Sequence, residues 1–252
     1  ISVTGVQTCA LPIYILLDDI GIEGQEKFLS SHVVIIGAGG LGSAAAPYLA
    51  AAGIGKISLI DHDLVETTNL QRQIMHNHDA VGMPKVASGK KMLNQLNPQT
   101  QIIEIQQKAT PELLDELLPD ASAVLDCTDN FKTRHLINAA CIKHQVPLIS
   151  GAAIGFDGQI TVIDPRDPHS PCYACIFPED QNFDEVRCST MGVFSPLVGI
   201  IGGIQAAQTL QVIGKIGEPL LGKLLLWDAR TSQVNEIQLH KQTTCKICSI
   251  KN

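Results

Sequence analysis

The sequence has 252 residues, 45% of them hydrophobic and 17% charged, with 18 Lys and Arg against 25 Asp and Glu. This composition excludes a disordered or fibrous chain and predicts one large globular domain or two small ones. The net charge of −7, with no run of like charges, argues against nucleic acid or an anionic membrane surface as partner. The most apolar stretch, 193–207, is interrupted by Ser195, Pro196 and three glycines, so we expect a buried helix and no membrane span.

The N-terminal residues 1–13, ISVTGVQTCALPI, carry no charge and no amphipathic period. We expect a disordered or non-native leader there, followed by a single domain over residues 14–252. The first basic residue is Lys27, so the leader lacks the basic region of a secretory signal and the Arg-rich character of a transit peptide. We therefore expect a cytoplasmic protein.

Predicted strands and helices alternate in the first half of the chain. A β-branched strand at 33–36 leads into the glycine turn GAGGLG at 37–42, a helix at 43–52 and a strand at 56–60 that ends in Asp61. The alternation continues with helices at 85–96, 111–118 and 131–144 and strands at 101–105, 123–125 and 147–150. This order predicts a Rossmann-like, doubly wound α/β fold with a mostly parallel sheet.

The pattern changes after Gly151. Strands are expected at 159–163, 223–229 and 234–239 with fewer helices between them, which favours an antiparallel extension of the same sheet. A long Pro-rich and acidic loop at 165–188 is of the kind that covers active sites.

The glycine turn predicts a nucleotide phosphate at a helix N-terminus. Gly37, Gly39, Gly40 and Gly42 would let the backbone approach an anion, and Asp61, 19 residues past Gly42, would accept hydrogen bonds from ribose hydroxyls. The alternatives are a close helix-to-strand packing turn for the glycines and a turn cap for Asp61.

Polar and cationic side chains follow the second strand. Asn69, Arg72, Gln73 and Lys85 would suit a triphosphate, although each alone could be a solvated surface residue. Asp129 follows another strand, so we expect it at the same edge of the sheet, where its carboxylate suits Mg²⁺ beside phosphates. The alternative is that Asp126 or Asp129 only caps the helix that begins near Phe131.

Four of the eight cysteines form two C-x-x-C pairs, Cys172 with Cys175 and Cys245 with Cys248. In a reducing compartment such pairs predict a structural zinc site that joins the C-terminal tail to the long loop and leaves no open position for catalysis. A redox C-x-x-C is the alternative.

Eight motifs occur in a fixed order: GAGGLG at 37–42, D-x-D at 61–63, NLQRQ at 69–73, GMPK at 82–85, LDCTDN at 125–130, SGAA at 150–153 and the two C-x-x-C pairs. From about residue 16 to its C-terminus, the chain resembles the ThiF/MoeB/HesA family, bacterial relatives of ubiquitin-activating enzymes. The resemblance implies a homodimeric adenylyltransferase that uses ATP and Mg²⁺. Its partner would be a ubiquitin-like sulfur-carrier protein ending in Gly-Gly, in molybdenum-cofactor synthesis or, with the same motifs, in thiamine synthesis.

The resemblance also implies roles for the predicted site residues. Gly40 lies against the phosphates, Asp61 holds the ribose, and Asp129 serves Mg²⁺ and the α-phosphate. The β- and γ-phosphates and the leaving pyrophosphate are contacted by Asn69, Arg72, Gln73 and Lys85. Arg72, Lys85 and Asp129 are the expected catalytic residues, within a nucleotide-binding half over about 30–150 that precedes a carrier-binding and zinc half over about 151–252.

The remaining cysteines divide into two kinds. Cys188 lies beside Arg187, which would lower its pKa, and a cysteine near this point accepts the carrier as a thioester in ubiquitin-activating relatives. The alternative for Cys188 is a plain buried thiol. Cys127 and Cys141 are expected to pack in the core.

The sequence departs from the family at its N-terminus. Ile13 and Tyr14 stand where family members have Arg and Gln, and that Arg reaches into the partner subunit's ATP site. We expect a truncated or mis-joined start and, in the chain as written, a lower rate than in family members that carry this Arg. Two other classes remain open: an NAD(P)-dependent oxidoreductase, which leaves Arg72, Lys85 and the four cysteines without a purpose, and a catalytically silent binding subunit.

Overall fold

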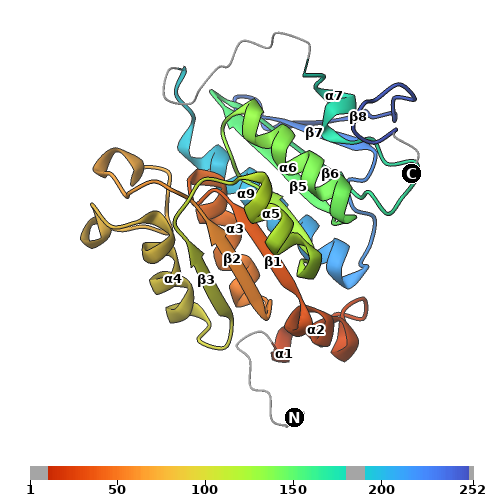
Figure 1. Cartoon of the computed structure of the whole chain (residues 1–252). Coiled ribbons are helices and arrows are strands. Elements are labelled where there is room, and N and C mark those ends of the chain that lie inside the picture. Colours follow the sequence, from red (N-terminus) through yellow and green to blue (C-terminus); the bar gives the residue numbers. More distant parts are fainter. Residues whose placement is uncertain (1–10, 180–190, 250–252) are drawn as a thin grey trace.

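The computed structural model describes residues 11–179 and 191–249, so Cys9 and Cys188 lie outside the described residues. Within these ranges, one eight-stranded sheet has the order β3-β2-β1-β4-β5-β6-β7-β8 (Figure 1). Its strands are β1 His32–Ile36, β2 Lys56–Ile60, β3 Gln101–Ile105, β4 Ala123–Asp126, β5 Leu148–Ile154, β6 Asp157–Ile163, β7 Lys223–Asp228 and β8 Gln233–Gln238. The helices are α1 Leu11–Tyr14, α2 Gly21–Ser30, α3 Gly40–Ala51, α4 Lys85–Leu96, α5 Pro111–Leu117, α6 Phe131–His144, α7 Tyr173–Ile176 and α9 Ser195–Gly214.

Strands β3, β2, β1, β4 and β5 pair in parallel and are covered on both faces by helices. Every residue of β1 is buried, and its side chains alternate between two cores. Val33 and Ile35 pack on one side with α3, α4 and α9, whereas Val34 and Ile36 pack on the other with α5 and α6. Figure 1 shows α5 and α6 in front of the sheet, with α3 and α9 behind it.

Strands β5, β6, β7 and β8 continue the same sheet in antiparallel pairing. The predicted parallel, doubly wound sheet with an antiparallel extension is therefore confirmed. Several boundaries differ from expectation, and the one that bears on the site is the start of α3, which lies at Gly40 and not at Ser43. The last three residues of the glycine turn thus form the first turn of the helix, where backbone N–H groups have no intrahelical partner.

Helix α9 is the one described helix that is long and apolar enough to cross a membrane, by length and composition alone. In the fold it is a core helix: Leu197 and Ile201 are completely buried, and Gly202 lies so close to α3 that an added Cβ would be 2.4 Å from the Leu41 carbonyl oxygen. The expected buried helix is thus confirmed for one face. Its other face, which includes Ile200 and Ile204, is only partly covered by the described chain.

Candidate functional site

The glycine turn links β1 to α3 at the carboxyl edge of the parallel strands. Close packing requires three of its glycines, since an added Cβ would lie 2.6 Å from the Cys127 carbonyl oxygen at Gly37, 2.9 Å from the Val198 side chain at Gly40 and 2.0 Å from the Gly37 carbonyl oxygen at Gly42. Gly39 differs, because its nearest neighbour would be Gln73 Nε2, at an ordinary 3.7 Å. Close packing therefore explains three of the four glycines. Only at Gly39 is there free space that a Cβ would fill, and we call this space the Gly39 cradle.

Side chains hold both the backbone N–H and the backbone carbonyl of Ala38, in the middle of this turn. Asp61 Oδ2 accepts a hydrogen bond from the Ala38 N–H at 2.7 Å, and Asp61 Oδ1 accepts one from the Asp63 N–H at 2.8 Å. On the other side, His76 Nε2 donates to the Ala38 carbonyl oxygen at 2.9 Å, while Nδ1 accepts from the Ser88 hydroxyl at 2.9 Å. The turn is therefore fixed by Asp61 and His76.

Sequence reasoning missed His76. Burial, with a smaller contribution from the charge of Lys85, lowers the pKa of this imidazole, so it is neutral at neutral pH and holds the tautomer that its two partners require. A single histidine in the apolar segment QIMH gives no signal of this role. Only the fold brings its ring beneath the glycine turn.

Lys85 is the first residue of α4, and its ammonium group is nearly buried. Nζ lies 2.8 Å from Asp63 Oδ2, with 7% of the Lys85 side chain and 51% of the Asp63 side chain exposed. Partial burial would raise the pKa of Asp63, but the hydrogen bond and charge of Lys85 outweigh it and hold that pKa below its usual value. A buried cation beside a half-exposed carboxylate can still attract a second anion.

Three more predicted ligands lie on the segment between β2 and α4. Asn69 Oδ1 accepts a hydrogen bond from the Glu66 N–H at 3.2 Å, which directs its amide N–H groups elsewhere. Arg72 donates to the Thr68 carbonyl oxygen at 3.4 Å, and in the described part of the chain no carboxylate pairs with it. Gln73 is only 3% exposed, yet its Oε1 has no hydrogen-bond partner among the described residues. The Gln73 amide lies next to Gly39 through its Nε2, so it offers a buried donor there, and its unpartnered Oε1 offers an acceptor; both fit a polar ligand.

The loop after β4 brings Asp129 to the same edge, because Asp126 pairs with Ile36 at the end of β1. Asp126 accepts hydrogen bonds from Thr128 and Ser150, and Asn130 caps α6 by accepting from the Thr133 N–H at 2.9 Å. The alternative that Asp126 or Asp129 caps this helix is therefore wrong. Asp129 is exposed, and an exposed carboxylate beside a phosphate site fits Mg²⁺.

The two C-x-x-C pairs come together although 73 residues separate them. The Sγ–Sγ distances are 3.9 Å for Cys172 and Cys175, 3.6 Å for Cys172 and Cys245, and 3.5 Å for Cys175 and Cys248. In a tetrahedral zinc site with Zn–S bonds of about 2.3 Å, two sulfur ligands lie about 3.8 Å apart, which is close to these distances. The cluster therefore fits a structural zinc ion that joins α7 to the segment after β8, and no disulfide links these thiols.

The expectation for Cys127 and Cys141 is confirmed. Both are buried, and burial strongly raises the pKa of each thiol. Neither can supply a thiolate at neutral pH. The prediction for Cys188 falls outside the described residues.

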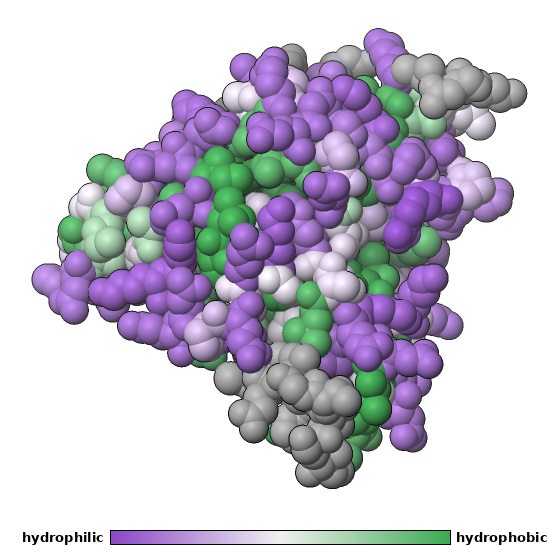
Figure 2. Space-filling view, turned by 60° about the horizontal axis from the view of Figure 1, so that its bottom comes forward, coloured by the Kyte–Doolittle hydropathy of each residue, from purple (hydrophilic) through white to green (hydrophobic). Residues whose placement is uncertain are grey.

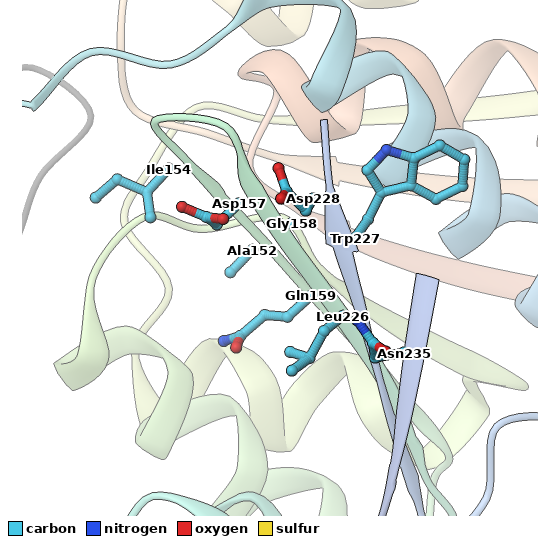
Figure 3. A pocket seen from close by; sticks show the side chains of 9 residues that line it. All are labelled: Ala152, Ile154, Asp157, Gly158, Gln159, Leu226, Trp227, Asp228 and Asn235. Carbon is cyan, nitrogen blue, oxygen red and sulfur yellow. The ribbon is translucent and has the colours of Figure 1, made fainter. Parts of the chain in front are cut away.

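A second concavity, of about 350 Å³, lies on the antiparallel part of the sheet. Figure 3 shows Asp157 and Asp228 near one end of it, with Gln159, Leu226 and Asn235 further along the strands. The two carboxylates face each other across β6 and β7, and Arg230 Nη1 lies 3.5 Å from Asp157 and 3.9 Å from Asp228. The pocket thus has an apolar strip and a charged rim.

The comparisons with known proteins agree with this architecture. The ThiF family pattern matches residues 14–247. The chain is 43% identical to the sulfur carrier protein ThiS adenylyltransferase of Escherichia coli, over 94% of both chains, and 40% identical to the molybdopterin-synthase adenylyltransferase of Salmonella typhimurium, over 93% of both. The crystal structure of E. coli MccB with ATP matches with a TM-score of 0.78 and 27% identity, over 89% of this chain and 68% of that one. The chain therefore belongs to the ThiF family and is an enzyme of the nucleotidyltransferase type.

Proposed function

We propose that this enzyme uses ATP to adenylylate the C-terminal glycine of a small ubiquitin-like sulfur-carrier protein. The terminal carboxylate attacks the α-phosphorus, the bond from the α-phosphorus to the bridging oxygen breaks, and pyrophosphate leaves. The observation that carries the proposal is the open space at Gly39 beside the buried Gln73 amide, whose Nε2, a hydrogen-bond donor that suits a phosphate oxygen, is the atom nearest to that space. Relatives over nearly the whole chain that are named adenylyltransferases support it.

The reaction needs positioning and charge stabilisation and no protein nucleophile. In our proposal the N–H groups at Gly39 and Gly40 face the phosphates, and Asp61 accepts from the ribose. Asp129 carries Mg²⁺ next to the α-phosphate. The β- and γ-phosphates and the pyrophosphate that leaves are held by Asn69, Arg72, Gln73 and Lys85.

The carrier has two candidates. The small subunit of molybdopterin synthase is the first, and the thiamine-pathway carrier is the second. Relatives named for each pathway match at 40% and 43% identity over nearly the same length, so overall similarity favours neither. Which carrier supports turnover decides between them.

We propose that the carrier docks on the half of the chain over about 151–252, after the nucleotide-binding half over about 30–150. The pocket between β6, β7 and β8 offers an apolar strip for its surface and a charged rim for orientation. A fully coordinated zinc ion at Cys172, Cys175, Cys245 and Cys248 would hold this half in place and leave no open position for catalysis.

We also propose a homodimer in the cytoplasm. Hydrophobic side chains form several separate patches on the face in Figure 2. The described chain covers two apolar regions only in part: the outer face of α9, where Ile200 and Ile204 are half-buried, and the entry to α2, where Leu16 is 76% and Leu17 50% exposed. A second copy would bury such surface. A thiol cluster that binds zinc also suits a reducing compartment.

The test is ATP–pyrophosphate exchange with a panel of carriers that end in Gly-Gly. We expect exchange with one carrier and none without a carrier or with a carrier that lacks the last glycine. If none of the carriers supports exchange and the protein binds NADH, as measured by NADH fluorescence, an oxidoreductase would be favoured. Carrier binding without exchange would favour a silent binding subunit.

A further inference from the structure

Arg134, in the first turn of α6, is a buried cation that the proposed chemistry does not use. It is 8% exposed, its Nη2 donates to the Thr128 carbonyl oxygen at 2.7 Å, and its Nε lies 4.0 Å from Asp126 Oδ2. A buried guanidinium is stable only where such partners surround it. Arg134 therefore fixes the loop at the residue directly before Asp129.

The same helix contacts the cysteine cluster one turn further on. Asn138 is fully buried, and its Oδ1 accepts a hydrogen bond from the Tyr173 N–H at 2.9 Å. Tyr173 stands between Cys172 and Cys175, the first C-x-x-C pair. Residues four apart share one face of a helix, so α6 holds the Asp129 loop and the cluster from the same side.

The side chain of Tyr173 closes this connection. It is 1% exposed, and its ring packs edge-on against the ring of His135, the residue after Arg134 on α6, with ring centroids 5.2 Å apart. The Asn138 hydrogen bond and this ring contact together join α7 to α6. A movement of α7 would therefore act on the helix that carries Arg134.

We propose that Arg134 and Asn138 couple the cysteine cluster to the loop that carries Asp129, so that metal binding at the cluster and nucleotide binding at the glycine turn strengthen each other. Arg134 acts as a positioning residue, through Thr128. This inference rests on the proposed function, because it places Asp129 at the nucleotide. Coupling between two sites is reciprocal, so the nucleotide must tighten metal binding by the same factor as the metal tightens nucleotide binding.

The test measures the zinc affinity of the whole chain by competition with a chromogenic chelator, with and without saturating MgATP. We expect MgATP to tighten zinc binding at least about fivefold, the lower end of typical couplings. Arg134→Met should abolish this effect, and Arg134→Lys, which keeps a donor for the Thr128 carbonyl, should restore part of it. Arg166→Met is the matched control, since Arg166 pairs with Asp164 at the surface and should leave the effect intact.

The magnesium requirement gives a second readout. Arg134→Lys should raise the Mg²⁺ concentration for half-maximal pyrophosphate exchange severalfold, whereas Arg166→Met should not change it. Residues that only pack the core would not produce this selective change. An unchanged Mg²⁺ requirement in Arg134→Lys would contradict the positioning role.

The zinc affinity of the wild-type chain with and without MgATP tests the coupling without any variant, so the test does not depend on whether Arg134→Met folds. Equal zinc affinity with and without MgATP, in a preparation that exchanges pyrophosphate, overturns the coupling and leaves the proposed function standing. A preparation that binds no ATP overturns both. A cluster that takes up no zinc overturns the coupling alone.

Discussion

Gly39→Ala separates ligand binding from folding at the glycine turn. The backbone of Gly39 has φ −81°, which alanine can adopt, and the nearest atom to an added Cβ would be Gln73 Nε2 at 3.7 Å. We therefore expect the free energy of unfolding to change by less than about 1 kcal/mol, since the substitution is a Gly-to-Ala change at a helix N-cap. A methyl group in the cradle would keep the phosphates away from the backbone N–H groups. ATP affinity should fall at least about tenfold, or about 1.4 kcal/mol.

Gly42→Ala is the matched contrast on the same turn. Its Cβ would lie 2.0 Å from the Gly37 carbonyl oxygen, so the backbone itself must move. Overpacking of this kind costs about 1–3 kcal/mol. Urea unfolding should therefore show a clear loss of stability for Gly42→Ala and nearly none for Gly39→Ala.

Isothermal titration calorimetry with a non-hydrolysable ATP analogue gives the affinities. Wild-type affinity in a folded Gly39→Ala would refute the reasoning, because the phosphates could not then lie in the cradle. Strong destabilisation by Gly39→Ala would refute it in another way, by showing that packing also requires this glycine.

Four further predictions concern single residues. Lys85→Met should reduce pyrophosphate exchange at least about 100-fold by removing a buried cation from the phosphates, while Lys90→Met, on the same helix but in a surface ion pair, should change it little. Ile13→Arg, at a position 72% exposed, should raise exchange at least about tenfold, and no gain would contradict the assignment of this position. Burial lowers the pKa of His76, so the stability that the neutral ring contributes should be lost as pH falls below about 6.5. Between pH 7.5 and pH 5.5, the free energy of unfolding in urea should therefore fall more in wild type than in His76→Gln. Cys175→Ser should lower the unfolding midpoint and the zinc content together, and a chelator should reproduce the midpoint shift in wild type but not in the variant.

Hydrophobic period and glycine spacing were enough to predict the sheet. The strand at 101–105 and the helices at 85–96 and 131–144 match β3, α4 and α6 residue for residue. These segments have strong local patterns with clear ends, and the chain order of a doubly wound fold leaves few topologies for them.

The contacts that fix the site depend on tertiary structure. Asn130, and not Asp126 or Asp129, caps α6, because β4 extends through Asp126 and the loop places Asn130 directly before the helix. His76 and Arg134 gave no signal in the sequence, since each acts on a backbone carbonyl that only the fold brings near. Spacing predicts which side chains reach an edge of the sheet, but not which buried groups hold that edge in place.

Mass spectrometry of the carrier tests the central claim most directly. The enzyme is incubated with MgATP, pyrophosphatase and a carrier ending in Gly-Gly, and the carrier is then analysed intact. The account predicts an increase in mass by one adenylyl group at the terminal glycine, absent without ATP and absent in a carrier that lacks that glycine. A carrier that binds the enzyme and stays unmodified while pyrophosphate is removed would contradict it.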